Sequence, residues 1–303
     1  MKNGKNGHAT ASSQNGGGIP SFNADKVYFK NAQCMKEIPD ACVDLVLTSP
    51  PYFNVKDYAK DGYQSATHSS RRKGQLGDIG DYAVFIGELA KVWRECERVL
   101  KPNGKLAINA PLMPMPKKDY CTHYNRHIFD LNADIQHSII GQEDNGMFLY
   151  DVFIWNRTNG RKNLMFGSYP YPRNFYAQNT SEFISVYVKD GKPINNVERA
   201  EKKKSQLTEE EWLLYTRQIW DIPIPNKKDS AFGKHSAIMP EEIARRCIRL
   251  FTYVGDLVLD PFAGSGTTLK MAKVLDRKYV GYEIMKSYES VIKAKLSSVA
   301  LPL

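Results

Sequence analysis

A glycine-rich segment near the carboxyl end constrains the fold of this chain more than any other feature. An apolar run from Leu257 to Asp260 leads into the sequence DPFAGSGTT, and a helical pattern follows from Leu269 to Leu275. A second apolar run then ends at Glu283. The order strand, glycine turn, helix, strand is typical of a βαβ unit, in which glycines let a ligand approach the backbone. An acid about 20 residues after such a turn can bind ribose hydroxyls.

The spacing of the glycines narrows the choice of ligand. The turn lacks the GxGxxG pattern of dinucleotide sites, and it lacks the lysine of the GxxxxGK[ST] loop that holds triphosphates. A lone Gly-x-Gly is explained by turns in most chains. The whole sequence of strand, DPFAGSGTT, helix, strand and acid is far more specific.

A second loop, Thr48 to Tyr52, places two prolines directly after the apolar run Val43 to Leu47. Proline cannot donate a ladder hydrogen bond and so ends a strand. Taken alone, TSPPY is most simply a strand-ending turn with a core tyrosine. The helical spacing from Tyr82 to Leu100 and the strand from Leu106 to Asn109 predict a parallel sheet. Ligands bind at the carboxyl edge of such sheets, where we expect both loops to meet.

Together these motifs resemble those of S-adenosylmethionine-dependent DNA amino-methyltransferases, the N4-cytosine and N6-adenine family. In that family Asp, Asn or Ser precedes Pro-Pro and an aromatic residue, as in Ser49-Pro50-Pro51-Tyr52. Here this motif precedes the glycine loop, which is similar to the permuted beta group. The resemblance covers about residues 25–303. It implies a three-layer, doubly wound α/β fold with a mostly parallel, Rossmann-like sheet and a small target-recognition insertion.

The resemblance implies S-adenosyl-L-methionine as the cofactor. Members of this family often have Asp at the position of Gln33, whose side chain would contact the adenine. His235 is followed by Ser236, at a position where the family commonly has Pro. The residues expected to bind the cofactor are Gln33, His235, Asp260, Phe262, Gly264, Ser265, Gly266, Thr267 and Glu283.

The resemblance also assigns the transfer chemistry to Ser49, Pro50, Pro51 and Tyr52. An exocyclic amino group is a poor nucleophile and must be aimed in line with the methyl group. The Ser49 side chain and the Pro50 carbonyl would accept its hydrogens, the prolines would fix the loop, and Tyr52 would stack on a flipped base.

The sequence leaves more than one acceptor of the methyl group open. Ser as the first motif residue favours cytosine N4, and adenine N6 is the alternative. A protein or RNA amino-methyltransferase is disfavoured, because those usually have the glycine loop first. Methylation of cytosine C5 needs a cysteine thiolate that attacks the ring, commonly a cysteine directly after a proline. No cysteine of this chain follows a proline, so this reaction is rejected.

The charge of the chain favours a polyanionic partner. The formal net charge is +9, with 42 Lys and Arg against 33 Asp and Glu, and the resemblance implies double-stranded DNA. An aromatic and basic stretch, 157–178, includes Arg157 and could grip the DNA backbone; a loop of ordinary core aromatics beside solvated charges is the alternative. The residues expected to bind DNA are Arg71, Arg72, Lys73, Arg161 and Arg173.

Residues 1–20 are rich in Gly, Asn and Ser and are expected to form a flexible tail. For the rest of the chain the resemblance implies a catalytic half (21–189), a target-recognition region (190–232) and a cofactor-binding half (233–303). Five cysteines without CxxC spacing argue against disulfides and a metal site. No signal peptide and no apolar run of about 18 residues is present, so we expect a cytoplasmic protein without a membrane span. The resemblance further implies a restriction–modification role, with a cognate endonuclease and a homodimer as candidate partners.

Overall fold

The computed structural model describes residues 23–53, 76–114, 128–141, 144–160, 168–174, 177, 179–193, 197–226, 229 and 238–298. Its strands are β1 (Lys26–Tyr28), β2 (Val43–Thr48), β3 (Leu100–Pro114), β4 (Ile128–Asp130), β5 (Met147–Asn156), β6 (Ser181–Lys189), β7 (Ile219–Asp221), β8 (Leu257–Asp260) and β9 (Lys278–Tyr282). Its helices are α1 (Tyr82–Val99), α2 (Leu131–Ile140), α3 (Arg199–Lys204), α4 (Glu209–Tyr215), α5 (Glu241–Phe251), α6 (Thr267–Val274) and α7 (Glu289–Ser297), with short 3-10 turns η2 (Leu76–Asp78) and η4 (Lys286–Tyr288).

The strands form one nine-stranded sheet in the order β1-β9-β8-β2-β3-β6-β5-β7, with β4 added to β3. Strands β1, β9, β8, β2 and β3 are mutually parallel, and β6 runs antiparallel between β3 and β5. The predicted mostly parallel sheet is therefore confirmed. Strand β8 lies beside β2 although Thr48 and Asp260, their last residues, are 212 residues apart in sequence.

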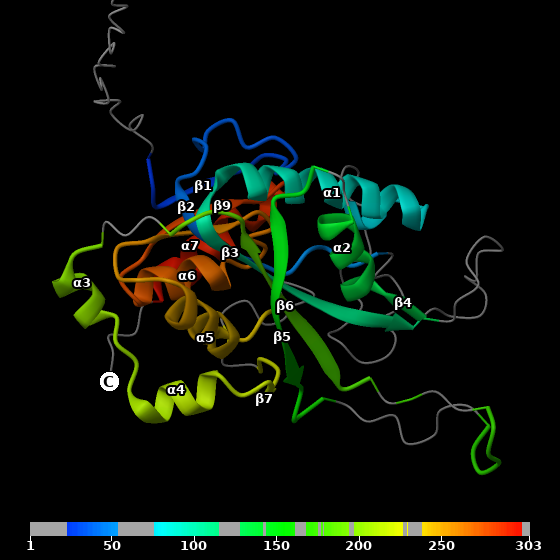
Figure 1. Ribbon diagram of the computed structural model, residues 1–303. Coiled ribbons are helices and arrows are strands. Elements are labelled where there is room, and N and C mark those ends of the chain that lie inside the picture. Colours follow the sequence, from blue (N-terminus) through cyan, green and yellow to red (C-terminus); the bar gives the residue numbers. More distant parts are fainter. Residues whose placement is uncertain are drawn as a thin grey trace, which may run out of the picture.

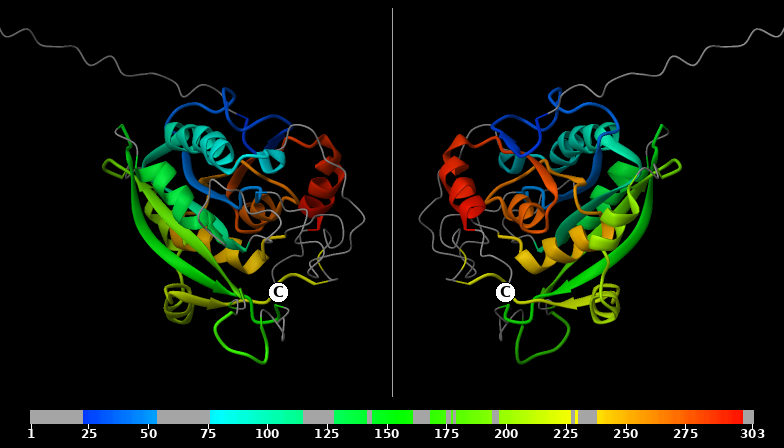
Figure 2. Two further views of the ribbon diagram at one scale, coloured as in Figure 1. Left: turned by 90° about the vertical axis from the view of Figure 1, so that its right-hand side faces the viewer. Right: turned by 90° about the vertical axis from the view of Figure 1, so that its left-hand side faces the viewer.

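Helices cover both faces of the sheet and make the three layers that were predicted (Figures 1 and 2). Along β8, Leu257 and Leu259 pack with α1 and α2, and Val258 packs with α5, α6 and α7. Strand β9 alternates in the same way. Buried strands with apolar side chains on both faces are what a parallel sheet between two helical layers requires.

Helix boundaries follow local capping signals. The Asp81 side chain accepts a 2.9 Å hydrogen bond from Val84 N at the start of α1. Helix α4 begins with a capping box formed by Thr208 and Glu211, and α5 begins directly after Pro240. These signals act within one turn of chain, so the sequence alone predicts them.

Two segments differ from the sequence prediction. The strand predicted at Leu106–Asn109 is longer, since β3 already begins at Leu100. Asn103, with a φ of 64°, lies inside β3, where the register with β2 shifts. Strand β7, within the predicted recognition region 190–232, pairs with β5 and is the edge strand of the main sheet. Trp220 of β7 is fully buried and stacks on Phe153 at 4.6 Å, so this part of the segment belongs to the core.

Figure 1 shows α3 and α4 on the side of α5, away from α1 and α2. Arg249 of α5 and Glu211 of α4 form an ion pair at 2.5 Å that joins the two helices. Among the helices of the described segments, none is both long and apolar enough to cross a bilayer.

Candidate active site

The two loops singled out in the sequence lie side by side. Strands β2 and β8 are parallel neighbours, with Leu45 opposite Val258 and Val46 opposite Leu259. Both strands therefore end at the same edge of the sheet. The last residues of the two strands touch, because Thr48 Oγ1 donates a 2.6 Å hydrogen bond to Asp260 Oδ1.

The glycine turn after β8 folds back tightly on its own backbone. Gly264 and Gly266 have φ values of 50° and 86°, in the left-handed region that favours glycine. The Gly266 amide donates a 2.6 Å hydrogen bond to the Ala263 carbonyl, and the Ala263 amide donates to Tyr282 of β9 at 2.8 Å. Helix α6 starts at the next residue, Thr267. The turn thus connects β8 to α6 while remaining fixed to β9.

Glu283 follows β9 and faces the glycine turn. Its Oε2 accepts a 2.9 Å hydrogen bond from Gly264 N, and its Oε1 accepts one of 2.7 Å from Met285 N. Its own amide donates to Tyr28 at the end of β1 at 3.0 Å. A buried carboxylate fixed against a close-turning backbone fits the ribose hydroxyls and the close contact that an adenosine cofactor needs. These residues therefore fit S-adenosyl-L-methionine.

Burial controls the charge of Asp260. Its side chain lies beneath the turn, where loss of solvent raises the pKa of the carboxyl to about 6. Hydrogen bonds from Thr48 and from the Phe262 amide, at 2.6 Å and 3.0 Å, oppose the shift. Phe262 itself packs edge-on against Trp93 of α1, with ring centroids 6.0 Å apart. Asp260 therefore acts as the internal anchor of the turn.

Lys295 of α7 supports the turn from behind. Its ammonium group donates a 2.8 Å hydrogen bond to Thr267 Oγ1 and pairs with the Asp229 carboxylate at 3.0 Å. Ser265 Oγ lies 3.3 Å from Thr267 Oγ1. Lys295 is only 1% exposed. This lysine is not predicted by the sequence, because α7 carries two lysines and nothing in the pattern distinguishes the buried one.

The Pro-Pro loop is held by polar contacts at both of its ends. Pro50 is buried, and the Ser49 and Tyr52 side chains are half-buried. The Ser49 hydroxyl donates to the Asn109 carbonyl at 3.2 Å and lies 3.3 Å from Tyr52 Oη. Ser49 and Tyr52, three residues apart, thus face each other across the two prolines.

A buried polar network lies beneath this loop and was missed in the sequence. Glu182 Oε2 accepts hydrogen bonds from Tyr52 Oη at 3.3 Å and from Asn109 Nδ2 at 3.0 Å. Arg157 Nη1 pairs with Glu182 Oε1 at 3.2 Å. The available signal was Glu182 itself, a charged residue directly before the largely apolar run 183–188. The role of Arg157 as a DNA contact is wrong, because its side chain is only 9% exposed and pairs internally.

Burial also shifts the ionisation of this network. Loss of solvent raises the pKa of Glu182, and the Arg157 guanidinium opposes that shift. The pKa of Tyr52 is raised well above its ordinary value, chiefly by burial and then by the adjacent Glu182 carboxyl. Tyr52 therefore keeps its hydroxyl proton at neutral pH.

Gln33 lies in the loop after β1, the strand beside β9. Its side-chain nitrogen donates to the Glu88 carboxylate at 2.6 Å and to the Glu88 carbonyl at 3.1 Å. These bonds tie the loop to α1. Contact of Gln33 with adenine stays a prediction.

The predicted DNA contacts are only partly described. Arg71, Arg72, Lys73, Arg161 and the predicted cofactor residue His235 lie outside the described residues. Arg173 is exposed, with a φ of 86°, and lies near the exposed rings of Tyr169 and Tyr171 in the segment 168–174. Its contact with DNA stays a prediction.

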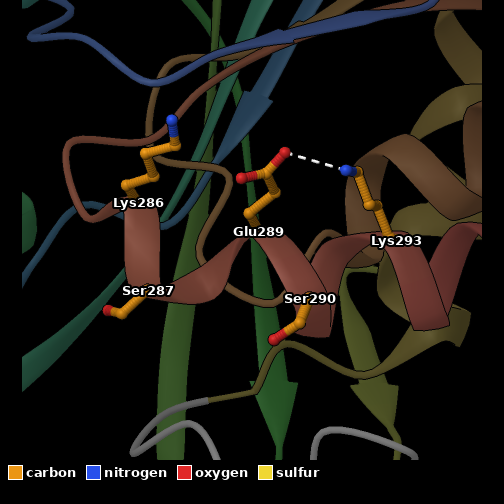
Figure 3. Close-up of a pocket in the computed structure, with 5 residues that line it drawn as sticks. All are labelled: Lys286, Ser287, Glu289, Ser290 and Lys293. Carbon is orange, nitrogen blue, oxygen red and sulfur yellow. Dashed lines mark ion pairs between the residues drawn. The ribbon is translucent and has the colours of Figure 1, made fainter.

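A surface hollow of about 310 Å³ lies at the start of α7 (Figure 3). Lys286 and Glu289 extend to one side of the chain there, and Ser287 and Ser290 point to the other. Glu289 pairs with Lys293 at 2.8 Å. The polar groups diverge, so this hollow is not arranged as a catalytic site. Within the described segments no group of three or more His, Cys, Asp or Glu side chains could hold a metal ion.

Comparison with known proteins identifies the family. The model of a family described as DNA methylase, covering N6 and N4 methyltransferases, matches residues 43–294. The chain belongs to this family. This DNA methylase is 32% identical over 288 residues to the type II methyltransferase M.MjaI of Methanocaldococcus jannaschii, covering 89% of this chain and 90% of that protein. It is 27% identical to M.MthZI of Methanothermobacter thermautotrophicus, covering 90% of this chain and 76% of the relative.

Solved structures agree with this identification. The putative DNA modification methylase TTHA0409 from Thermus thermophilus, solved in complex with S-adenosyl-L-methionine, has a TM-score of 0.67 and 30% identity, covering 90% of this chain and 93% of that one. The cytosine-N4-specific PvuII DNA methyltransferase has a TM-score of 0.63 at 18% identity, covering 90% and 86%, which is a likeness of fold. The family recognised from the sequence motifs, whose methyl donor is S-adenosyl-L-methionine, is thereby confirmed.

Proposed function

We propose that this DNA methylase transfers a methyl group from S-adenosyl-L-methionine to N4 of a flipped-out cytosine in a specific site of double-stranded DNA. The observation that carries this proposal is the hydrogen bond between Thr48 and Asp260. It joins the start of the Ser-Pro-Pro-Tyr loop to the start of the glycine turn. A donor held by the turn and a base held by the loop would then lie within reach of each other.

The cofactor half of the site would be built by the turn after β8 and the acid after β9. Bound S-adenosyl-L-methionine supplies an electrophilic methyl group on a sulfonium. Glu283 would accept hydrogen bonds from the ribose hydroxyls, and the Gly264–Gly266 turn would let the cofactor approach the backbone closely. Asp260 would hold this turn in position through its bonds to Thr48 and the Phe262 amide.

The acceptor half would be built by the loop after β2. Ser49 Oγ and the Pro50 carbonyl would accept the hydrogens of the exocyclic amino group, which makes its nitrogen a better nucleophile and aims its lone pair. Tyr52 would provide the aromatic surface on which a flipped base stacks. Ser as the first motif residue supports cytosine N4, and adenine N6 is the alternative.

Charge supports double-stranded DNA as the substrate. The net charge of +9 and the basic helix α3, whose Lys203 and Lys204 are exposed, favour phosphate contacts. The relatives are named as type II methyltransferases. We therefore propose a restriction–modification role with a cognate endonuclease that acts on the same site.

Labelling identifies the product directly. The protein is incubated with tritiated S-adenosyl-L-methionine and duplex DNA of mixed sequence, and the digested nucleosides are separated. Labelled N4-methylcytosine supports the proposal, whereas labelled N6-methyladenine replaces it with the adenine reaction. Label on protein with none on DNA would rule out DNA as the substrate. A Ser49→Ala variant with intact cofactor binding serves as the inactive control.

A further inference from the structure

Glu182 occupies the point where the Pro-Pro loop meets the sheet, and the proposed chemistry gives it no role. It is the second residue of β6 and lies opposite Pro111 of β3 and Trp155 of β5. Because β6 is antiparallel to β3, its first residues lie at the edge where β2 and β8 end. The Glu182 side chain is buried, so its acceptor capacity is directed toward protein groups and not toward solvent.

The donors around Glu182 come from three separate segments. Tyr52 Oη and Asn109 Nδ2 lie 3.3 Å and 3.0 Å from Oε2, and Arg157 Nη1 lies 3.2 Å from Oε1. Asn109 and Arg157 also bond to backbone carbonyls, of Phe183 and Thr180 respectively, at 3.3 Å each. The guanidinium beside the carboxyl favours its ionised form. An ionised carboxylate only accepts hydrogen bonds.

Counting protons along this network fixes the direction of each bond. A hydroxyl carries a single proton. Tyr52 gives its proton to Glu182, so Tyr52 cannot also donate to Ser49. The Ser49 proton then points inward, either to the Asn109 carbonyl at 3.2 Å or to Tyr52 Oη at 3.3 Å. Ser49 Oγ therefore presents its lone pairs, and not its proton, to the space in front of the loop.

We propose that Glu182 is a positioning residue which, acting through Tyr52, keeps the Ser49 hydroxyl as a hydrogen-bond acceptor and thereby selects an amino group over a carbonyl on the target base. This inference rests on the proposed function. Cytosine N4 and adenine N6 present N–H donors, whereas thymine O4 and guanine O6 present acceptors at the corresponding position. An acceptor at Ser49 attracts the first pair and repels the second.

A Glu182→Gln variant tests the direction of the network, because its amide can donate to Tyr52 Oη. Tyr52 is then released to donate to Ser49, where it competes with the amino group of the base. We expect kcat to fall about 10–100-fold, the effect of one misdirected buried hydrogen bond, with S-adenosyl-L-methionine binding unchanged by calorimetry. The ratio of the binding affinity for a duplex with cytosine at the target position to that for the same duplex with thymine there should fall about tenfold.

Combining Glu182→Gln with Tyr52→Phe shows whether Glu182 acts by setting the direction of the Tyr52 hydrogen bond or only by packing in the core. Without the tyrosine hydroxyl nothing donates to Ser49, so Glu182→Gln/Tyr52→Phe should turn over at the rate of Tyr52→Phe alone, faster than Glu182→Gln. If Glu182→Gln lowers kcat by the same factor in both backgrounds, Glu182 does not act through Tyr52 and the inference is overturned. A general packing role would give that additive result.

A pH profile tests the inference even where Glu182→Gln does not fold. A protonated Glu182 can donate a hydrogen bond to Tyr52, as the amide of Glu182→Gln can. Among the described residues, the charged and titratable groups that face Glu182 are Arg157 and Tyr52, and Asn109 is its other partner. The wild type should lose kcat on the acid side, and Tyr52→Phe should not. Equal acid limbs in the two proteins would overturn the inference while leaving the proposed function intact. A wild type that methylates no DNA would overturn both.

Discussion

The Thr48 hydroxyl and the Asp260 carboxylate meet at 2.6 Å across 212 residues of chain. Each is the last residue of its strand, and the strands are parallel neighbours. Both groups are buried. This hydrogen bond holds the loop after β2 and the turn after β8 at a fixed separation, which is what transfer of a group between two separately bound molecules requires.

Removing the Thr48 hydroxyl should lower both the stability of the fold and the rate of catalysis. Thr48→Val keeps the side-chain shape but leaves Asp260 without this donor, so we expect the free energy of unfolding to fall by about 1–3 kcal/mol. Urea denaturation measures this loss. We expect kcat to fall as well, because the two loops lose their direct connection. Thr48→Ser keeps the hydroxyl and should restore both quantities. Equal stability in the valine and serine variants would contradict this role.

The raised pKa of Asp260 predicts how stability depends on pH. Burial lifts the pKa from 3.8 to about 6, so between these values the folded protein holds a proton that the unfolded chain releases. This group's contribution is therefore complete below the lower value and is lost as pH rises through the upper one, a difference of about 3 kcal/mol. The difference in unfolding free energy between wild type and Asp260→Asn, measured from about pH 4 to pH 7, should show it. A constant difference would contradict it.

The sequence predicted those parts of the site that rest on local signals. The glycine turn, Glu283 and the Pro-Pro loop each follow a recognisable apolar run, and parallel strands place such loops at one edge. The network of Glu182, Asn109 and Arg157 was missed because its members lie on β6, β3 and the loop after β5. They meet only through long-range pairing. Arg157 was misassigned for the same reason, since an arginine beside aromatic residues looks exposed until its partner is known.

Strand β7 shows the same limit at the level of the fold. The prolines that follow Trp220 in the sequence indicate an extended segment, yet no local signal indicates that Trp220 pairs beside Trp155. The position of this segment in the chain favoured a recognition region outside the sheet. Burial of Trp220 against Phe153 determined the outcome instead.

Lys295 and Lys293 of α7 form a matched pair for testing support of the glycine turn. Lys295→Met removes one member of a buried ion pair with Asp229 and the donor to Thr267. We expect a loss of about 3–5 kcal/mol in unfolding free energy and weaker cofactor binding by calorimetry. Lys293→Met breaks only an exposed pair with Glu289 and should leave both measurements unchanged. Similar effects of the two changes would show that Lys295 has no special role.

Gly266 should be required for cofactor binding beyond its effect on stability. Its φ is 86°, and an added Cβ would lie 3.3 Å from Ile292 Cγ2 of α7. Gly266→Ala introduces backbone strain of about 1–2 kcal/mol and pushes the turn away from α7. We therefore expect S-adenosyl-L-methionine binding, measured by calorimetry, to weaken strongly.

Gly255 provides the control for this change. Its φ is 88°, almost the same as that of Gly266, and an added Cβ would meet no atom within 4 Å. It precedes β8, at the opposite end of the strand from the glycine turn. Gly255→Ala should therefore reproduce the backbone strain and the loss of stability but leave cofactor affinity unchanged. If both variants lost the same affinity, global destabilisation would explain the effect, and Gly266 would have no specific part in holding the cofactor.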